Sequence, residues 1–395
     1  MVITTLRVAV VGAGIGGLAA AVALSRAGFR VDVYEQAAEL RETGVGLHLG
    51  CNGGRILHRW GLAGPLAESG VRPAALEVRD WNGGRVLARQ PMGAAWERRF
   101  GAPYHTIHRA DLHRILADQV PADSVHLNRR LTGYTEADDQ VFLEFAEGGV
   151  ASADILVGAD GIHSAVRRAV AGPDARVFSG ASAFRGLIEA DRVPGLPAET
   201  MFIWPGQGPR LLCYPVGRGR LTFVGIVPGR DGDVESWNSP GDPADLAAAF
   251  EGWNTDVKAL VDAVTETRRW GLYDREPLPR WSTGRVTLLG DAAHPMLPHH
   301  GQGAGQAIED AVALAFCLAR DPGPEGIAAY EAVRRPHTTR VQLGSRGGGS
   351  MRLRAGDADG RRDSPGLAAT VEDASWIQGY DVQEELETSG ARRSG

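Results

Sequence analysis

The order of apolar and polar positions in residues 7–36 predicts a strand, a helix and a second strand. Val8–Val11 is a short apolar run, which is typical of a parallel strand buried on both faces. A helix is expected over Ala19–Ala27, ending near Gly28, and a strand over Phe29–Tyr34. This order predicts a β–α–β unit with parallel strands.

Two later apolar runs also end in glycine and aspartate. Ile155–Val157 leads into the sequence GADG, and Val286–Leu289 leads into GD. After a proline-containing loop, Gly301–Gly305 precedes a segment with apolar residues on one helical face. We therefore expect two more strands, each followed by a turn, and a helix that begins near Gly303.

The pattern changes between Phe178 and Trp270, where turn pairs separate short alternating runs. The runs are Ser182–Ile188, Glu199–Trp204, Arg210–Val216 and Arg220–Ile226. They predict an antiparallel sheet, with a strand pair added from Trp81–Arg89. Helices are expected over Pro243–Gly252 and Thr255–Thr267.

The first turn carries the residues that a dinucleotide needs. Gly12, Gly14 and Gly17 fit G-x-G-x-x-G, and Glu35 closes the second strand 18 residues after Gly17. Gly12 permits the tight turn, Gly14 lets the backbone approach a pyrophosphate at the helix N-terminus, and Gly17 allows close packing. Glu35 can accept both ribose hydroxyls and would repel a 2′-phosphate. This pattern therefore predicts an ADP-containing cofactor, but it does not distinguish NAD from FAD.

The later glycine–aspartate turns favour FAD. Asp291 at a strand end can bond ribitol hydroxyls, and a helix that begins near Gly303 directs free N–H groups and positive dipole at one spot. Reduced flavin carries negative charge that such a helix end would stabilise, whereas a nicotinamide ring has no comparable need. The alternative is that Asp160 and Asp291 only cap helices, but their joint occurrence in this order favours the flavin.

Composition excludes several other classes. The chain has 395 residues, 53 of them glycine, and a net charge of −6, which argues against nucleic-acid binding. Lys258 is the only lysine, so there is no Walker A loop. The three cysteines have no paired spacing that would indicate a disulfide framework or a zinc site. Glycines interrupt the first apolar segment, so we expect neither a signal peptide nor a membrane span. We therefore expect a cytoplasmic protein.

These motifs resemble the group A single-component FAD-dependent aromatic hydroxylases, which have the para-hydroxybenzoate hydroxylase-like fold. The resemblance rests on GAGIGG at Gly12–Gly17, GADG at Gly158–Gly161 and GDAAHPMLP at Gly290–Pro298 followed by QGAG. It covers most of residues 7–340 and is similar in particular to the salicylate, 3-hydroxybenzoate and 6-hydroxynicotinate hydroxylases.

The resemblance implies an α/β fold in which a Rossmann-type FAD-binding domain carries an inserted antiparallel-sheet substrate domain and a C-terminal helical segment. Residues 1–75, 101–177 and 275–343 would form the FAD-binding domain, and residues 76–100 and 178–274 the substrate domain. Residues 344–395 would comprise a linker, a helix over Thr370–Leu386 and a tail disordered after Glu387.

The resemblance also implies which residues bind FAD. Glu35 and Arg41 would contact the adenosine, the Leu131 backbone the adenine, and Arg109 the pyrophosphate or ribitol. Without the resemblance, the sequence around Arg109 would favour an ion pair with Asp111 or Asp118 on the surface of a helix. The complete expected FAD set is Gly12, Gly14, Ile15, Gly16, Gly17, Glu35, Gln36, Arg41, Arg109, Leu131, Asp160, Asp291, Gly303 and Ala304.

The substrate is expected between the inserted sheet and the flavin, with His48, Arg210 and Tyr214 as the catalytic candidates. By resemblance His48 could deprotonate a phenol or hydroxypyridine; alternatively it only bonds backbone in a tight loop. Arg210 would suit a carboxylate or could face solvent. Further expected lining residues are Phe184, Arg185, Pro295, His299 and His300. His299 and His300 are adjacent in a loop, which makes them poor joint metal ligands.

The resemblance implies the reaction. NAD(P)H, bound transiently, would reduce FAD, O2 would add to form a C4a-hydroperoxide, and its distal oxygen would move to a small electron-rich aromatic substrate. An alternative is a tailoring oxygenase, in which hydroxylation of an indole or polyketide leads to cyclisation. A halogenase is disfavoured because it needs a lysine near the pocket, and Lys258 falls on an outer helix. A second alternative is not an enzyme: a regulatory protein that binds the nucleotide but catalyses no reaction.

Overall fold

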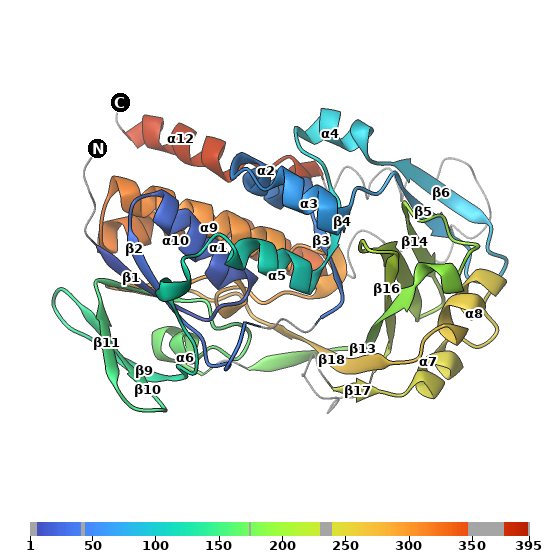
Figure 1. Ribbon diagram of the computed structural model, residues 1–395, viewed down its shortest axis with the longest axis horizontal. Coiled ribbons are helices and arrows are strands. Elements are labelled where there is room, and N and C mark those ends of the chain that lie inside the picture. The colour runs from blue at the N-terminus through green and yellow to red at the C-terminus, as the bar shows by residue number, and fades with distance from the viewer. Residues whose placement is uncertain (1–5, 41–43, 174, 230–238, 347–374, 394–395) are drawn as a thin grey trace.

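Two large sheets organise the chain in the computed structural model, which describes residues 6–40, 44–173, 175–229, 239–346 and 375–393 (Figure 1). The first sheet has the strand order β19-β20-β12-β1-β2-β8. Its strands are β1 (Arg7–Val11), β2 (Arg30–Tyr34), β8 (Val125–His126), β12 (Ile155–Gly158), β19 (Ser282–Thr283) and β20 (Val286–Leu288). All neighbours pair in parallel except β19 and β20. The parallel strands expected from the apolar runs are therefore confirmed, and their carboxyl ends meet at one edge.

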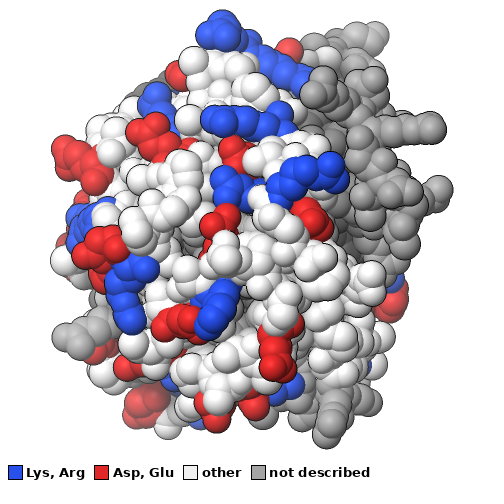
Figure 2. Space-filling view, turned by 90° about the vertical axis from the view of Figure 1, so that its right-hand side faces the viewer, with Lys and Arg blue, Asp and Glu red and all other residues white. Residues whose placement is uncertain are grey.

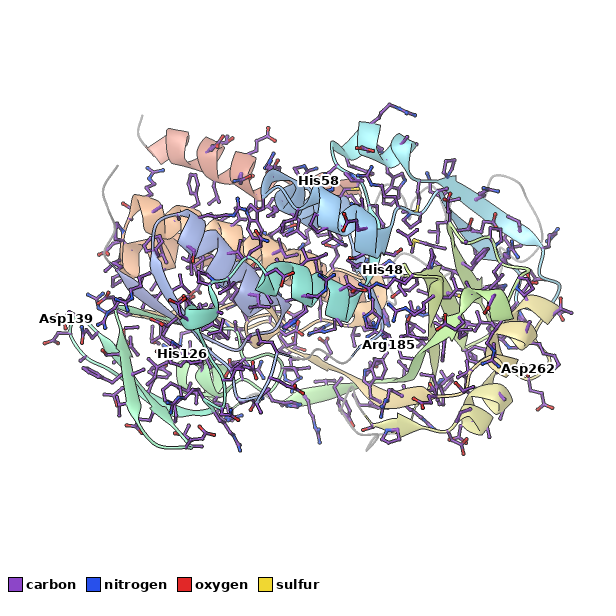
Figure 3. All side chains as sticks on the ribbon, viewed as in Figure 1. His48, His58, His126, Asp139, Arg185 and Asp262 are labelled. Atoms are coloured by element: carbon purple, nitrogen blue, oxygen red, sulfur yellow. The ribbon has the colours of Figure 1, made fainter. Side chains whose placement is uncertain are left out.

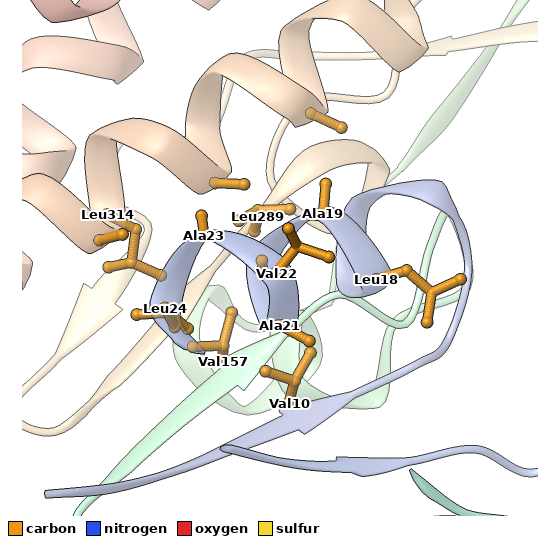
Figure 4. Packing of buried hydrophobic residues seen from close by; sticks show 14 of the residues in the cluster. Val10, Leu18, Ala19, Ala21, Val22, Ala23, Leu24, Val157, Leu289 and Leu314 are labelled. Carbon is orange, nitrogen blue, oxygen red and sulfur yellow. The ribbon is translucent and has the colours of Figure 1, made fainter. Parts of the chain in front are cut away.

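Helix α1 (Ile15–Arg26) packs between this sheet and α9 (Gly303–Arg320) (Figure 4). Five of its nine buried residues are alanine or glycine, and these small side chains let the two helices approach closely. The helix begins at Ile15, four residues earlier than predicted, because Gly14 is in the extended conformation of an N-cap. Helix α10 (Pro324–Arg346) covers α9 from outside.

The second sheet has the order β17-β18-β13-β16-β15-β14-β5-β6. Its strands are β5 (Ala75–Arg79), β6 (Val86–Pro91), β13 (Arg176–Glu189), β14 (Thr200–Pro205), β15 (Arg210–Pro215), β16 (Arg220–Pro228), β17 (Pro240–Gly241) and β18 (Thr267–Arg275). All neighbours are antiparallel except β5 and β14. The long strands β13 and β18 extend from this sheet toward the first one (Figure 1). The antiparallel sheet predicted between Phe178 and Trp270 is thus present, while the division into domains stays a prediction.

Helices α7 (Pro243–Ala249) and α8 (Thr255–Asp262) lie at the outer end of the second sheet (Figure 1). Lys258 is on the exposed side of α8 and pairs with Asp262 at 2.7 Å. Figure 2 shows acidic and basic side chains interspersed over this end of the molecule. The expected outer position of Lys258 is confirmed.

Two smaller sheets, further helices and short turns complete the described chain. One three-stranded sheet contains β3 (Gly46–Leu49), β7 (His105–His108) and β4 (Gly70–Val71); another contains β9 (Leu131–Glu136), β10 (Val141–Phe145) and β11 (Val150–Ala153). Further α-helices of the described chain are α2 (Cys51–Arg59), α3 (Ala63–Ser69), α4 (Ala94–Phe100), α5 (Arg109–Ala117), α6 (Ala165–Ala171) and α12 (Val382–Arg393). Single 3-10 turns are η1 (Ala122–Ser124), η2 (Ala190–Arg192), η3 (Gly290–Ala292) and η4 (Pro298–His300).

Two helix predictions were wrong in extent. The helix expected over Thr255–Thr267 ends at Asp262, because Thr267 already begins β18, where it pairs with Gly241 of β17. In the C-terminal segment, 370–374 lie outside the described residues, a bend at Gly379 interrupts the helix, and α12 continues to Arg393. The disordered tail expected after Glu387 is therefore helical up to that residue. Of the expected linker, only its first three residues are described, and they end α10.

The described residues contain no helix with the length and apolar character needed to cross a membrane.

Candidate active site

The glycine turn after β1 is held by contacts that admit no side chain. Gly12 has φ +100°, and a Cβ there would lie 2.5 Å from the carbonyl oxygen of Ala159. A Cβ at Gly17 would lie 1.8 Å from the carbonyl oxygen of Gly12, and one at Gly16 would lie 3.0 Å from Leu289. The roles predicted for Gly12 and Gly17 therefore correspond to real close approaches, and the turn leaves Gly14, Ile15 and Gly16 lining a cavity.

Glu35 ties the end of β2 to this turn. One carboxylate oxygen accepts from the Ala13 N–H and the other from the Ala37 N–H, both at 2.8 Å. A carboxylate has about four lone-pair sites, so each oxygen can still accept one ribose hydroxyl. The side chain thus fits the adenosine role predicted for it. Gln36 is exposed directly after Glu35, and Arg41 lies outside the described residues.

A cavity of about 260 Å³ extends from the glycine turn to the second sheet. Its lining on the side of the first sheet includes Gly14, Ile15, Gly16, Arg109, Ala159, Gly161, Leu289, Gly290, Asp291, Gly303 and Ala304. On the side of the second sheet it includes Arg185, Arg210, Leu212, Tyr214, Val224, Ile226, Trp270 and Leu272. The carboxyl edge of the parallel strands and one face of the antiparallel sheet therefore face the same space.

The N-terminus of α9 opens into this cavity. Gly303 and Ala304 are its first two residues, and the preceding Gln302 makes no side-chain capping bond. The first N–H groups of the helix are thus available to a ligand with negative charge. A carboxylate oxygen of Asp291 lies 3.8 Å from the Cβ position at Gly303. Donors for an anionic ring and an acceptor for hydroxyl groups occur together here, which fits the ribitol and isoalloxazine of FAD.

Arg109 begins α5 and lines the same cavity. Of the two acids that could have paired with it on the surface, Asp111 pairs with Arg218 at 2.9 Å and Asp118 pairs with Arg114 at 3.6 Å. The cavity position suits the predicted contact with the pyrophosphate or ribitol.

Asp160 and Leu131 are among the predicted FAD residues that do not line the cavity. The Asp160 carboxylate accepts from the Ser164 hydroxyl and from the Ala165 and Val166 N–H groups at the start of α6. It therefore caps this helix, beside the cavity that its neighbours line. Leu131 begins β9, where its side chain is buried in the main core away from the cavity lining.

The face of the second sheet presents alternate residues to the cavity. Arg210, Leu212 and Tyr214 follow one another at every second position of β15, as the strand period requires. Leu212 is paired with Val224 of β16, and Val224 with Arg185 of β13. The sheet thus supplies apolar side chains flanked by two arginines.

Arg185 and Tyr214 share one backbone acceptor. The Arg185 guanidinium donates to the carbonyl oxygen of Gly46, and the Tyr214 hydroxyl donates to the same oxygen at 3.1 Å. Burial and the nearby Arg109 charge lower the pKa of Arg185, although the Tyr214 hydroxyl opposes this. Burial raises the pKa of Tyr214 to about 12, so its hydroxyl stays protonated at neutral pH. An arginine in this setting favours an anion nearby.

His48 lies on β3, close to both groups (Figure 3). Its ring is 4.2 Å from the Tyr214 ring, and its Nδ1 is 2.7 Å from the Tyr104 hydroxyl. Burial, together with the Arg185 charge, lowers the pKa of His48 to about 4. The imidazole is therefore neutral at neutral pH.

Only some of the other residues expected to line the cavity do so. His299 lines the cavity, with its Nδ1 2.8 Å from the Ser345 carbonyl oxygen. Phe184 is buried in the outer core of the second sheet, and neither Pro295 nor His300 belongs to the lining. Among the described residues, no group of three or more histidine, cysteine or acidic side chains is placed to hold a metal ion.

A buried polar network behind α9 escaped prediction. Asp310 accepts from Arg334 at 2.7 Å, from His294 at 2.5 Å and from the Gly290 N–H at 3.1 Å. Glu309 pairs with Arg334 at 2.7 Å. The network supports the loop that carries Asp291. The only signal for it in the sequence is the pair of adjacent acids, Glu309 and Asp310, within an otherwise apolar helix. Buried charges are rarely unpaired, so such a pair indicates buried partners.

Comparison with known proteins gives a consistent result. The FAD binding domain family matches residues 5–344. The chain is 44% identical over 383 residues to a 3-amino-4-hydroxybenzoate 2-monooxygenase of Streptomyces platensis, covering 95% of this chain and 96% of that one. It is 38% identical to a 6-hydroxynicotinate 3-monooxygenase of Bordetella bronchiseptica, covering 98% of both. A salicylate hydroxylase solved with its substrate matches with a TM-score of 0.80 at 29% identity, over 97% of this chain and 98% of that one.

Proposed function

The chain belongs to the FAD binding domain family, and we propose that this FAD-dependent aromatic hydroxylase acts on a single-ring hydroxylated aromatic carboxylate. The first candidate is 3-amino-4-hydroxybenzoate, because it is named for the relative with 44% identity. FAD, once reduced by NAD(P)H, supplies the activated oxygen atom from O2.

The charge of the cavity lining carries this proposal. Three arginines line it, Arg109, Arg185 and Arg210, against one carboxylate, Asp291. If Arg109 and Asp291 contact FAD, Arg185 and Arg210 remain on the substrate side. A guanidinium binds a carboxylate through two parallel hydrogen bonds, which also fixes the orientation of the ring.

The apolar part of the sheet face would hold the aromatic ring. Leu212, Val224, Ile226 and Trp270 form a continuous surface between the two arginines and the glycine turn. Packing against it removes water from the ring and from the reacting carbon. Tyr214 would act by holding Arg185 through their hydrogen bond and their common acceptor, Gly46.

The other side of the cavity would hold FAD. Glu35 would bind the ribose, the glycine turn the pyrophosphate, and Asp291 the ribitol, while the Gly303 and Ala304 N–H groups would face the flavin ring. The substrate ring would then lie between the flavin and the sheet face.

The test uses the FAD-loaded protein with NADH or NADPH under air. The substrates compared are 3-amino-4-hydroxybenzoate, 4-hydroxybenzoate, 3-hydroxybenzoate, 6-hydroxynicotinate and salicylate. We expect at least one to accelerate NAD(P)H oxidation and to gain one atom of 18O from labelled O2. If none does either, the proposed substrate class is refuted.

The arginine assignment is tested with Arg185→Met. Loss of one charged hydrogen-bonded contact with a carboxylate costs about 2 kcal/mol, which corresponds to a rise in KM of about 30-fold. The matched control is Arg320→Met at the exposed end of α9, where Arg320 lies 3.8 Å from Asp321 and should leave KM unchanged. An equal KM in both variants would contradict the assignment.

The alternative of an indole or polyketide tailoring oxygenase is not supported. The relatives with 33% to 44% identity are named for single-ring aminohydroxybenzoate, hydroxynicotinate and hydroxybenzoate substrates.

A further inference from the structure

The hydrogen bond between Tyr104 and His48 decides which ring nitrogen of His48 carries the hydrogen. Tyr104 precedes β7, the strand that pairs with β3, and its hydroxyl lies 2.7 Å from His48 Nδ1. Burial raises the pKa of Tyr104 above its ordinary value. Tyr104 therefore keeps its hydrogen at neutral pH and must donate it somewhere, because an unmade bond from a buried donor costs about 1–3 kcal/mol.

Within the described residues, the Tyr104 hydroxyl has one hydrogen-bond partner, His48 Nδ1. If the tyrosine donates, Nδ1 accepts, and the hydrogen of the neutral imidazole resides on Nε2. In the opposite arrangement Nδ1 would donate, and the tyrosine hydrogen would be left buried without an acceptor. Hydrogen-bond satisfaction thus selects the Nε2–H form.

His48 Nε2 has no protein partner in the described part of the chain, and the His48 side chain lines the cavity. Arg185 is close enough for its charge to oppose protonation of the imidazole. Figure 3 shows His48 and Arg185 in the same central region, between the helices that cover the first sheet and the strands of the second sheet. Two hydrogen-bond donors therefore meet at the substrate side of the cavity.

We propose that Tyr104 is a positioning residue that holds His48 as a hydrogen-bond donor, so that the site binds the substrate hydroxyl as a phenolate. This inference rests on the proposed function and deepens it. On binding, the aromatic O–H bond breaks, the electron pair stays on the oxygen, and the proton passes to bulk water. The phenolate oxygen then accepts the Nε2–H bond, beside the Arg185 charge. The negative charge on the ring favours attack on an electrophilic oxygen at a neighbouring carbon.

If His48 acted as a base, as the resemblance implies, the substrate proton would end at a different place. As a base His48 would need its lone pair on Nε2 and would keep the substrate proton inside the site. Next to Arg185 the resulting imidazolium is disfavoured. The two mechanisms therefore differ in where the proton goes when the substrate binds.

Isothermal titration calorimetry of the FAD-loaded protein, without NAD(P)H, distinguishes them. 3-Amino-4-hydroxybenzoate is titrated at pH 7 in phosphate and in Tris, whose different ionisation enthalpies report the protons exchanged. We expect about one proton released per substrate bound, and binding that tightens about tenfold per pH unit below the phenol pKa. Binding without proton release overturns the inference but leaves the proposed function intact. No binding of this probe or of the other hydroxylated acids refutes the proposed function.

His48→Gln provides a second measurement, since its amide can donate a hydrogen bond but cannot take the proton at neutral pH. We expect it to keep the proton release; loss of that release, with binding retained, would overturn the inference that a hydrogen-bond donor at this position is sufficient.

The positioning role is tested with Tyr104→Phe, using 3-aminobenzoate as a probe that lacks the hydroxyl group. We expect the variant to bind 3-amino-4-hydroxybenzoate about tenfold more weakly, the loss expected for one hydrogen bond of about 1.4 kcal/mol. Its affinity for 3-aminobenzoate should stay that of the wild type. Equal weakening for both probes would mean that Tyr104 only supports the fold. Tyr134→Phe, on β9 outside the cavity lining, is the control and should change neither affinity.

Discussion

Replacing Asp310 by asparagine tests the buried network that supports the flavin-side loop. The Asp310 side chain is fully buried, and its carboxylate accepts from Arg334, His294 and the Gly290 N–H. Burial alone would raise its pKa, but the His294 and Arg334 interactions outweigh burial and lower it from 3.8 to about 2. At about 1.4 kcal/mol per pKa unit, this difference corresponds to about 2 to 3 kcal/mol of stability at neutral pH.

Because the folded pKa is depressed, this stabilisation is present above pH 4 and is lost as the pH falls toward 2. Asp310→Asn should thus lower the free energy of unfolding by about 2 to 3 kcal/mol at pH 7. For 395 residues this lowers Tm by about 3 °C. The difference from wild type should shrink by about 1 kcal/mol between pH 5 and pH 3.

The assay is urea unfolding of the FAD-loaded protein, followed by tryptophan fluorescence at several pH values. The control is Asp262→Asn, which removes the exposed ion pair with Lys258 and should cost less than about 0.5 kcal/mol. A loss below about 1 kcal/mol for Asp310→Asn, or a difference that does not depend on pH, would refute the assigned role of the carboxylate.

Three further predictions concern the cofactor and the cavity. Glu35→Gln should weaken FAD binding at least tenfold, measured by flavin fluorescence, because the charged acceptor of the Ala13 N–H is lost; unchanged affinity would exclude a ribose contact. Gly46→Ala should raise KM while the protein still binds FAD, because a Cβ would lie 2.4 Å from Thr222 and Val216; an unaltered KM would contradict it. The His48 pKa is lowered from 6.5 to about 4, so the unfolded chain takes up the proton first and the fold loses stability as the pH falls from 6.5 toward 4. In the folded protein, substrate binding should show no imidazole titration between pH 5 and 8; an inflection near 6.5 in a plot of Kd against pH would contradict this.

The sequence predicted the FAD side of the site more completely than the substrate side, for a physical reason. Gly12, Gly17 and Glu35 act through local spacing, because the turn, the helix start and the strand end follow one another along the chain. Their positions in the structure therefore follow from the order of residues. Asp160 shows the limit of this reasoning, since a cap and a ligand occupy the same kind of turn, and only coordinates show that its oxygens accept from α6.

The substrate side depends on contacts between distant segments. Gly46 receives hydrogen bonds from Arg185 and Tyr214, which lie 139 and 168 positions away, and periodicity cannot pair such residues. Tyr104 was not predicted at all, because a buried tyrosine looks like a core residue until its hydroxyl is seen beside His48.

The C-terminal segment contacts α2, the helix directly after the strand that carries His48. The Gln378 side chain accepts from the Cys51 N–H at 2.8 Å, Arg55 donates to the Tyr380 carbonyl oxygen, and Arg59 pairs with Asp381. During synthesis, α2 leaves the ribosome more than 300 residues before these partners. Helix α2, which follows the strand that carries His48, therefore gains these neighbours only after most of the described chain has been made. Proteolytic trimming before Gln378 would remove these contacts from the active-site region, although every residue that lines the cavity would remain.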